Sequence, residues 1–333
     1  MAREFQISGE QYFDEYILVA PGSDYGRAMW SDIERISNAT ILEKALKPCG
    51  KFLEVVHHIH FSFALNKITQ LPFQNIWKKL YSLESIGLKE DKKYCVIYTD
   101  VSAARTDLKY LAGLRAQTNI TLVLVMVNTM ARRGSLIEKR KGYFDIVFSF
   151  DRNDCDKYGF IYHPTYYSMT SMKAEDIVQD AFYVGVSKGR ASIITAVYER
   201  LMTQGAKAEF FISGLEPGEQ KRKGIHYNQW LKYRQVLDYI SKSNCIVEIM
   251  DGNQEGVTLR TMEAVCYNKR LLTNNASMKQ SKYYTSGYIQ VFDRPEDIDV
   301  DFVKDRSKVD YCYDGEFSPV HLLEHINKTV QSV

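Results

Sequence analysis

The run Ile120-Thr-Leu-Val-Leu-Val-Met-Val127 constrains the fold of this chain more than any other feature of its sequence. The run shows no alternation of polar and apolar residues, so it predicts a strand that is buried on both faces, as in the centre of a parallel sheet. It is far shorter than the roughly 20 apolar residues that span a bilayer. With 333 residues, the chain is long enough for two domains built around such sheets.

Further short apolar runs alternate with amphipathic segments along the chain. In the first half, strands are predicted at 16–20, 52–56, 94–98 and 145–149, and helices near 29–36, 75–82 and 106–115. In the second half, strands are predicted at 181–185, 207–212, 245–250, 270–273 and 289–292, and helices at about 190–202, 227–242 and 257–266. Such βα repeats predict parallel sheets covered by helices.

The order of these elements predicts the domain boundaries. We expect a first Rossmann-like domain at 1–165, a linker at 166–177, a second domain at 178–315, and a C-terminal helix within 316–333. Pro164 and the small polar residues after it suit a linker. Pro319, preceded by Ser318 as a cap, predicts the start of the last helix.

Composition excludes several classes of protein. The six cysteines contain no CxxC pair and several lie in apolar runs, which favours reduced core thiols over disulfides or zinc. A net charge of +2 gives no global field for nucleic acid. The N-terminus has no charged-then-apolar signal pattern, so a cytoplasmic protein is expected. His57, His58 and His60 lie within four residues, but no spaced cysteine or carboxylate completes a metal site, so none is predicted.

The stretch Glu255-Gly-Val-Thr-Leu-Arg-Thr-Met-Glu263 follows the predicted strand at 245–250 and is expected to start a helix. Gly256 lies where the strand becomes the helix, and a glycine there lets a ligand approach the main chain. The first-turn N–H groups of Val257 and Thr258 have no intrahelical partner. This arrangement predicts an anion site, most often a phosphate site.

Two carboxylates flank that site. Glu255 lies at the carboxyl end of a strand, where open α/β sheets bind ligands, and Glu263 lies two helical turns further on, three residues after Arg260. A carboxylate accepts strong hydrogen bonds from two neighbouring hydroxyls, so one acid can bind a sugar and the other a ribose. The alternative is that both are ordinary solvated helix charges.

The spacing of Glu255 and Glu263, with Gly256 after the first and Ala264 after the second, resembles the donor-binding signature of retaining GT-B glycosyltransferases. The longer form Gly-Val-Thr-Leu-Arg-Thr-Met-Glu-Ala, together with 144–168, resembles a branch of bacterial capsule and lipopolysaccharide glycosyltransferases. The resemblance implies an α/β GT-B fold, in which two Rossmann-like domains face each other across a cleft and the last helix returns to the first domain.

The same resemblance implies roles for individual residues. In the family a glycine and then a basic residue after the first strand of the second domain hold the donor diphosphate, which here points to Gly185 followed by Lys188 or Arg190. The family's usual arginine directly after the glycine is Val186 here. The alternative is that Lys188 and Arg190 are only two solvated charges in a strand-to-helix turn. Lys188, Arg190 and Glu255 are thus the catalytic candidates. Glu263 is expected at the ribose, and the helix start with Arg260 at the phosphates. No metal or other cofactor is expected.

Candidates for the acceptor side come from the first domain. Asp24 and Arg27 lie in the loop after its first strand, where the glycine spacing does not fit a dinucleotide fingerprint. His58 follows the predicted strand at 52–56, while Asp100 and Asn128 lie at strand ends. If the reaction inverted the sugar, Asp24, Asp100 or His58 would be the base.

Two charged segments remain. Arg132, Arg133, Lys139, Arg140 and Lys141 form a basic cluster that is either solvated surface or a contact to an anionic acceptor or to membrane headgroups. Residues 297–301 have the DxD spacing that holds a metal in GT-A enzymes, but they come after the donor motif, so coincidence is expected.

The sequence therefore predicts transfer of a sugar from a nucleoside diphosphate donor, with UDP assumed, to a saccharide or lipid-linked saccharide acceptor. The expected setting is bacterial surface polysaccharide synthesis, with retention, without a metal and without nucleic acid as a partner. The alternatives are a nucleotide-sugar epimerase or hydrolase on the same fold, or a catalytically silent GT-B subunit that binds a partner.

Overall fold

The computed structural model describes residues 5–20, 22, 24–62, 65–66, 71–173, 175–219, 221–250, 257–284 and 287–332. The chain divides into two compact units, unit 1 made of Met1–Ser168 and Phe317–Val333, and unit 2 made of Met169–Glu316. Each unit contains one six-stranded sheet, and every described strand pair in both sheets is parallel. The prediction of two parallel α/β sheets is therefore confirmed.

Unit 1 has the strand order β2-β1-β3-β4-β5-β6. Its strands are β1 (Glu15–Val19), β2 (Ala39–Leu42), β3 (Tyr94–Thr99), β4 (Ile120–Val125), β5 (Ile146–Ser149) and β6 (Ile161–Tyr162). Its helices are α1 (Asp24–Met29), α2 (Lys51–His60), α4 (Asp100–Ala103), α5 (Leu108–Arg115), α6 (Met130–Ile137), α7 (Arg152–Tyr158) and α12 (Val320–Gln331). Short 3-10 helices are η1 (Ile33–Arg35), η2 (Gln74–Leu80), η3 (Ser82–Ser85) and η4 (Lys141–Tyr143).

Unit 2 has the strand order β12-β11-β10-β7-β8-β9. Its strands are β7 (Gln179–Val186), β8 (Ala208–Ser213), β9 (His226–Tyr227), β10 (Ser243–Glu248), β11 (Arg270–Thr273) and β12 (Ile289–Val291). Its helices are α8 (Ala191–Thr203), α9 (Tyr233–Ser241), α10 (Leu259–Cys266) and α11 (Val300–Lys304), with 3-10 helices η5 (Ala276–Gln280) and η7 (Pro295–Asp297).

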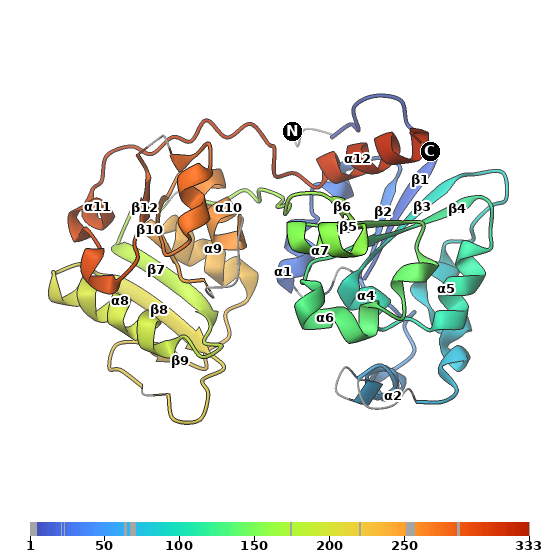
Figure 1. Cartoon of the computed structure of the whole chain (residues 1–333), viewed down its shortest axis with the longest axis horizontal. Helices are drawn as coiled ribbons and strands as arrows, with labels where there is room; N and C mark the ends of the chain where they lie inside the picture. Colours follow the sequence, from blue (N-terminus) through green and yellow to red (C-terminus); the bar gives the residue numbers. More distant parts are fainter. Residues whose placement is uncertain are drawn as a thin grey trace. The chain divides into compact units, whose positions relative to one another are not determined.

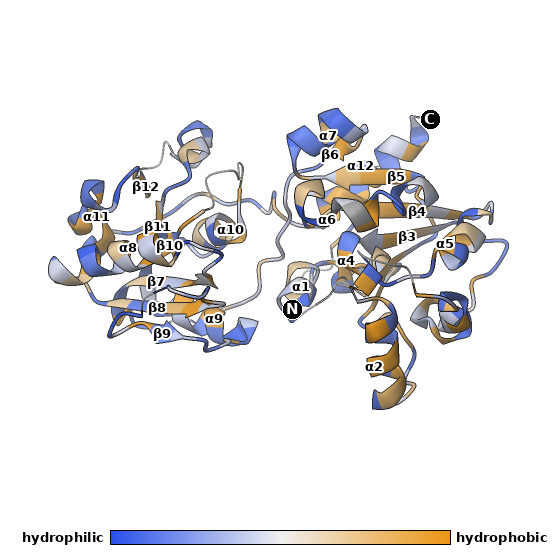
Figure 2. Cartoon of the chain, turned by 60° about the horizontal axis from the view of Figure 1, so that its bottom comes forward, coloured by the Kyte–Doolittle hydropathy of each residue, from blue (hydrophilic) through white to orange (hydrophobic). Residues whose placement is uncertain are grey.

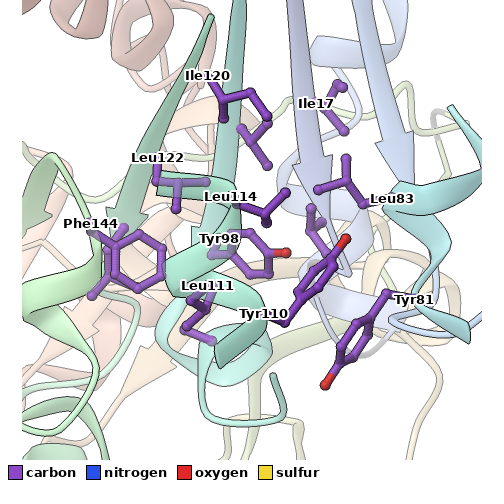
Figure 3. Close-up of a cluster of buried hydrophobic side chains, with 14 of the residues drawn as sticks. Ile17, Tyr81, Leu83, Tyr98, Tyr110, Leu111, Leu114, Ile120, Leu122 and Phe144 are labelled. Atoms are coloured by element: carbon purple, nitrogen blue, oxygen red, sulfur yellow. The ribbon is translucent and has the colours of Figure 1, made fainter. Parts of the chain in front are cut away.

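Strand β4 lies inside the sheet of unit 1, as the unbroken apolar run predicted. It pairs with β3 on one side and β5 on the other, and Leu122, Val123 and Leu124 are fully buried. On one face of the sheet, Leu122 packs in a cluster with aromatic side chains such as Tyr98 and Tyr110 (Figure 3). Burying each such aliphatic side chain contributes roughly 1.5–3 kcal/mol, so this cluster is a main source of stability in unit 1.

The C-terminal helix α12 returns to unit 1, as predicted (Figure 1). The Asn327 amide oxygen accepts hydrogen bonds from the Tyr16 hydroxyl at 2.8 Å and from the Tyr12 N–H at 3.1 Å. Just before the helix, the Ser318 hydroxyl donates to the buried Asp32 carboxylate at 2.8 Å. Buried polar contacts of this kind fix the register of α12 on the sheet.

The predicted strand at 52–56 is wrong, because those residues lie in helix α2. Gly50, with φ +84°, sets the start of the helix, and Leu53, Val56 and His57 are three and four residues apart and face the core. The second strand is instead β2, which was not predicted. The three histidines therefore lie on a helix, where His57 is buried and the His60 Nδ1 accepts from the Trp77 indole N–H at 2.8 Å.

Three predicted helices differ from the observed ones. The segment predicted as a helix at 29–36 contains only the end of α1, followed by η1, and the segment at 75–82 is mostly the 3-10 helix η2. The predicted helix at 227–242 covers only α9, because His226–Tyr227 pairs with β8 as strand β9.

The basic cluster at 132–141 is only partly a surface feature. Arg140 is 3% exposed and donates hydrogen bonds to the carbonyls of Ala103 at 2.9 Å and Leu136 at 3.1 Å. Its prediction as a membrane contact is therefore wrong, because its donors hold the main chain of unit 1 together. Lys141 pairs with Glu138 at 2.8 Å, Arg132 and Lys139 are exposed, and the Arg133 side chain lies outside the described part.

The DxD spacing at 297–301 serves local structure. The Asp299 carboxylate caps α11 by accepting from the N–H groups of Asp301 at 3.0 Å and Phe302 at 3.4 Å, and Asp297 pairs with Arg294. Among the described helices, none combines the length and apolar character needed to cross a bilayer.

Candidate functional site

The strand order of unit 2 changes direction at β7. Strands β8 and β9 lie on one side of it, and β10, β11 and β12 lie on the other. In open parallel sheets, ligands bind outside the carboxyl ends of the strands at such a point, because the two flanking loops diverge there. A cavity of about 220 Å³ lies at this place, lined by the ends of β7 and β10 and the start of α10. We call it the unit-2 cavity.

Five of the predicted site residues line the unit-2 cavity: Gly185, Lys188, Arg190, Thr258 and Arg260. They come from the β7–α8 turn and the start of α10, which are far apart in the sequence. Glu255 and Gly256, the first acid and the glycine of the motif, lie outside the described residues.

Helix α10 begins later than predicted, at Leu259. Thr258 is its N-cap, in an extended conformation with φ −101° and ψ 174°, and its hydroxyl oxygen accepts from the N–H groups of Arg260 at 3.1 Å and Thr261 at 3.5 Å. The N–H groups of Val257 and Thr258 therefore precede the helix rather than forming its first turn. Thr258 itself closes one wall of the cavity.

Sequence reasoning missed Glu248, a buried carboxylate in the cavity wall. It is 3% exposed at the end of β10 and accepts hydrogen bonds from the hydroxyls of Thr258, Thr261 at 3.0 Å and Thr273 at 2.5 Å. Burial raises the pKa of Glu248, and the threonine hydroxyls partly oppose that rise. Glu248 thereby fixes the start of α10 to β10 and β11. Its signal in the sequence is a single charged residue inside the apolar run at 245–250.

Arg260 and Glu263 form a buried ion pair on α10. Glu263 is fully buried, and the Tyr233 hydroxyl donates to its second oxygen at 2.9 Å. Burial alone would lower the pKa of Arg260, but the Glu263 carboxylate more than offsets this, so the pKa is raised and the guanidinium stays charged. Glu263 holds the Arg260 side chain, which lines the cavity, and Glu263 is not itself among the described lining residues.

Arg190 ties the β7–α8 turn to strand β10. Its guanidinium donates to the carbonyls of Ser187 at 3.0 Å and Val186 at 2.8 Å, and also to that of Ile249. Lys188, in contrast, is exposed at the cavity rim in a left-handed backbone conformation with φ +47°. Lys188 is therefore better placed than Arg190 to reach a phosphate in the cavity.

Gly185 is required by close packing against Tyr183. A Cβ atom at this position would lie 2.6 Å from the Tyr183 hydroxyl oxygen, which is closer than real Cβ contacts. The phenol and the glycine together form part of the cavity wall.

The N-terminus of α8 is already occupied by a carboxylate of this chain. Glu219 accepts from the Ser187 hydroxyl at 2.6 Å and from the Ala191 N–H at 3.1 Å. The Ser187 hydrogen bond, followed by those from main-chain N–H groups, lowers the pKa of Glu219. A bound anion in this structure would thus rely on the side chains of Lys188 and Arg260 rather than on α8.

Unit 1 has a second cavity of about 260 Å³ at the carboxyl ends of β1 and β3. We call it the unit-1 cavity, and it is lined by Ala20, Gly22, Glu43, Lys44, Ala45, Leu46, Glu54, His57, His58, Val101, Ser102 and Arg105. The strand order of unit 1 also changes direction here, with β2 on one side of β1 and β3 on the other. Lys44 and Glu54 pair across it at 2.9 Å.

His58 is the one predicted acceptor-side residue among those lining residues. Arg27 reaches the rim indirectly, by pairing at 2.7 Å with Glu43. The structure does bring Asp100 and Asn128 together, at 2.9 Å, but Asp100 is buried and also accepts from the Val127 N–H. Asp24 begins α1.

Sequence reasoning did not single out His57 or Arg105 for this cavity. His57 is 6% exposed, and its Nε2 atom has no hydrogen-bond partner among the described residues. Burial lowers the pKa of His57 to about 4, so its imidazole is neutral at pH 7. A neutral imidazole nitrogen at a cavity wall can accept or donate a proton.

The sequence matches no protein-family model and no curated protein. Solved structures resemble the fold. An α-glucosyltransferase in complex with UDP and a DNA 13-mer has a TM-score of 0.56 and 13% identity, covering 95% of this chain and 97% of its own. The UDP-GlcNAc 2-epimerase of Methanocaldococcus jannaschii has a TM-score of 0.50 and 11% identity, covering 96% and 99%. The fold is therefore the two-domain α/β fold of GT-B enzymes, as predicted.

Proposed function

We propose that this chain is a GT-B glycosyltransferase whose unit 2 holds a nucleoside diphosphate sugar, with UDP as the first choice. The observation that carries the proposal is the unit-2 cavity, where a basic rim lies at the point where the strand order changes direction. The α-glucosyltransferase and the epimerase that share the fold bind or act on UDP compounds, which supports the choice of donor.

The leaving diphosphate needs positive charge close to it, because negative charge develops there as the glycosidic bond breaks. Lys188 and Arg260 supply that charge in the proposal, and Arg190 shapes the turn that carries Lys188. No metal is assigned a role. Glu255 is proposed to bind the donor sugar. Glu263 is fully buried and bonded to Arg260 and Tyr233, so it is proposed to hold Arg260 in place rather than to bind the ribose as expected from the sequence.

The acceptor is proposed to bind in the unit-1 cavity, as a saccharide or lipid-linked saccharide of bacterial surface polysaccharide synthesis, with retention at the sugar. Lys44, Glu54 and Arg105 offer donors and acceptors for hydroxyl groups there. The α-glucosyltransferase with this fold was solved with DNA, so a DNA oligonucleotide belongs among the acceptors tested.

Titration calorimetry with UDP, GDP and ADP, with and without EDTA, tests the donor proposal. We expect UDP to bind with one site per chain and with the same affinity in EDTA. If none of the three nucleotides gave a heat of binding, the result would contradict the proposal and favour a catalytically silent subunit.

Two substitutions separate the roles of the acids. Glu263→Ala should weaken binding of free UDP by about 1.5–3 kcal/mol, the range for charged hydrogen bonds, because it removes the support of Arg260. Glu255→Ala should leave UDP affinity unchanged and lower kcat, because the contact proposed for Glu255 is to the sugar alone. Equal losses of UDP affinity would refute these assignments.

A nucleotide-sugar epimerase or hydrolase is the second candidate, favoured by the likeness to the UDP-GlcNAc 2-epimerase. Incubation of UDP-sugars without an acceptor distinguishes it. Release of free sugar, or a change of sugar configuration, would replace transfer as the assigned reaction.

A further inference from the structure

Helix α2 and the neighbouring η2 expose large apolar side chains to an unusual degree. Phe52 is 78% exposed, Val55 56% and Ile59 50% on α2, while Phe73 is 76% and Ile76 58% exposed at η2. Figure 2 shows α2 as a mainly hydrophobic helix that extends away from the sheet of unit 1. We call these five residues the α2–η2 surface.

The exposed residues of α2 are not needed for its packing. Phe52, Val55 and Ile59 are three and four residues apart, so they form one stripe on the helix. The neighbouring side, with Leu53 and Val56, packs on the core of unit 1. The helix is therefore apolar on two sides, and an apolar stripe in water marks a site that another apolar phase covers.

Helix η2 is held directly against α2. The Trp77 indole N–H donates to the His60 Nδ1 at 2.8 Å, and the Gln74 amide donates to the His60 carbonyl at 3.1 Å. Phe73, next to η2, has φ +62°, a backbone conformation that bulky residues rarely adopt, and its ring is exposed. The two sets of exposed apolar side chains thus belong to one packed structural element.

The charge around this surface is mainly positive. Between residues 44 and 82 the sequence has six lysines and one glutamate. Lys51 is exposed at the start of α2, and Lys78 and Lys79 are exposed on η2. Apolar side chains rimmed by lysines are the pattern by which an amphipathic helix lies in the headgroup layer of an anionic bilayer.

We propose that the α2–η2 surface docks this chain onto an anionic membrane surface, with Phe52, Val55 and Ile59 inserted and the lysines at the headgroups. A second copy of the chain fits worse, because lysines would face lysines across a symmetric interface. A nucleic acid would use the lysines but leave the apolar stripe in water.

Docking would also set the position of the unit-1 cavity relative to the membrane. The side of α2 that turns from the stripe lines the unit-1 cavity through Glu54, His57 and His58. A docked α2 would hold this cavity at the bilayer surface, where a lipid-linked acceptor is found. The docking itself stands without the proposed sugar transfer, because membrane binding is measured without donor or acceptor.

Cosedimentation with phosphatidylcholine vesicles, with and without phosphatidylglycerol, tests the proposal. The full chain should bind vesicles that contain phosphatidylglycerol, and the triple variant Phe52→Ser, Val55→Ser, Ile59→Ser should bind at least about tenfold less. Trp230→Ser is the matched control, because Trp230 is 76% exposed in unit 2 and should not affect binding.

Three outcomes would overturn the proposal. These are no binding of the wild type to anionic vesicles, equal binding of the triple variant, or equal loss in the Trp230→Ser control. A concentration-dependent dimer that the triple variant abolishes would assign the surface to a second copy instead, and retention on DNA would assign it to nucleic acid. Because the substituted side chains are exposed, circular dichroism should show an unchanged fold for the triple variant.

Discussion

Units 1 and 2 build the same parallel sheet and then use its carboxyl edge differently. In unit 2, three charged groups at the cavity are held by named partners, with Arg260 on Glu263, Arg190 on three carbonyls and Glu248 on three threonines. In unit 1, the cavity is lined by imidazoles and by an ion pair between exposed side chains. The more buried charges of unit 2 suit the constant nucleoside diphosphate that we propose there, whereas the more exposed pair of unit 1 suits the acceptor that we propose there.

The largest expected effect concerns the buried pair of unit 2. Arg260→Met leaves the Glu263 carboxylate buried without its charge partner, so the free energy of unfolding should fall by about 3–5 kcal/mol. Denaturant unfolding measures the loss. The double variant Arg260→Met, Glu263→Met should recover most of that stability and still fail to bind UDP. A double variant that binds UDP like the wild type would remove Arg260 from the site.

The buried histidines of unit 1 and the buried carboxyl groups of the unit-2 site should respond to acid in opposite directions. Burial lowers the pKa of His57 and of His163 in unit 1 to about 4, against 6.5 in the unfolded chain. Between these values the unfolded chain takes up the protons, so stability is present above pH 6.5 and is lost as pH falls toward 4, by about 3 kcal/mol at most per histidine. Burial raises the pKa of Glu248 and Glu263 in unit 2, so their contribution is present at low pH and is lost as pH rises.

Hydrogen exchange between pH 6.5 and 4.5, corrected for intrinsic rates, measures this difference. Strands of unit 1 should lose protection before those of unit 2. His57→Phe should reduce the pH dependence of unit 1, while His226→Phe, at a half-buried histidine in unit 2, should not. Earlier loss of protection in unit 2 would contradict the comparison.

Glycine substitutions should have opposite signs in the two units. Gly185→Ala in unit 2 places a Cβ against the Tyr183 hydroxyl and should destabilise the protein by about 1–3 kcal/mol. Gly113→Ala in helix α5 of unit 1 meets no atom within 4 Å and should stabilise it by about 0.5–1 kcal/mol. Thermal unfolding of both variants gives the comparison, and destabilisation by Gly113→Ala would show that space does not decide the sign.

The smallest expected effect tests which ligand binds in which cavity. Lys188→Met at the rim of the unit-2 cavity should raise the Kd for UDP about tenfold, the loss of one charged hydrogen bond. Arg105→Met in the unit-1 cavity should leave that Kd unchanged and raise the KM for the acceptor. If both variants changed UDP affinity equally, the assignment of ligands to units would be wrong.

The strands were predicted well from the sequence where both faces of the strand are buried, because burial of both faces removes ambiguity in the apolar pattern. Strand β11 matches its predicted bounds, and the central strand β4 lies within its apolar run. The helix α2 was mistaken for a strand because 52–56 is a short apolar run, in which the helical period is not visible. Strand β2 was missed because only its pairing with β1 distinguishes it from a loop.

The candidate site likewise contains residues that the sequence identified and residues that it missed. Gly185 and Lys188 were named through the family resemblance, and Thr258 was named because a helix was expected to start there. Glu248 was missed because its three threonine partners come from α10 and β11 as well as the loop before α10, and only the folded chain brings them together. Likewise, the burial of Glu263 depends on Tyr233 from α9, which spacing along one helix does not reveal.

Hydrogen exchange on the whole chain with and without UDP tests the central claim most directly, because it reports where the nucleotide lies. We predict new protection in the β7–α8 turn at 184–191 and at the start of α10 at 257–262, and unchanged exchange in α2 and in residues 43–46 of the unit-1 cavity. Protection confined to the unit-1 cavity, or no protection at saturating UDP, would contradict the assignment of the donor to unit 2.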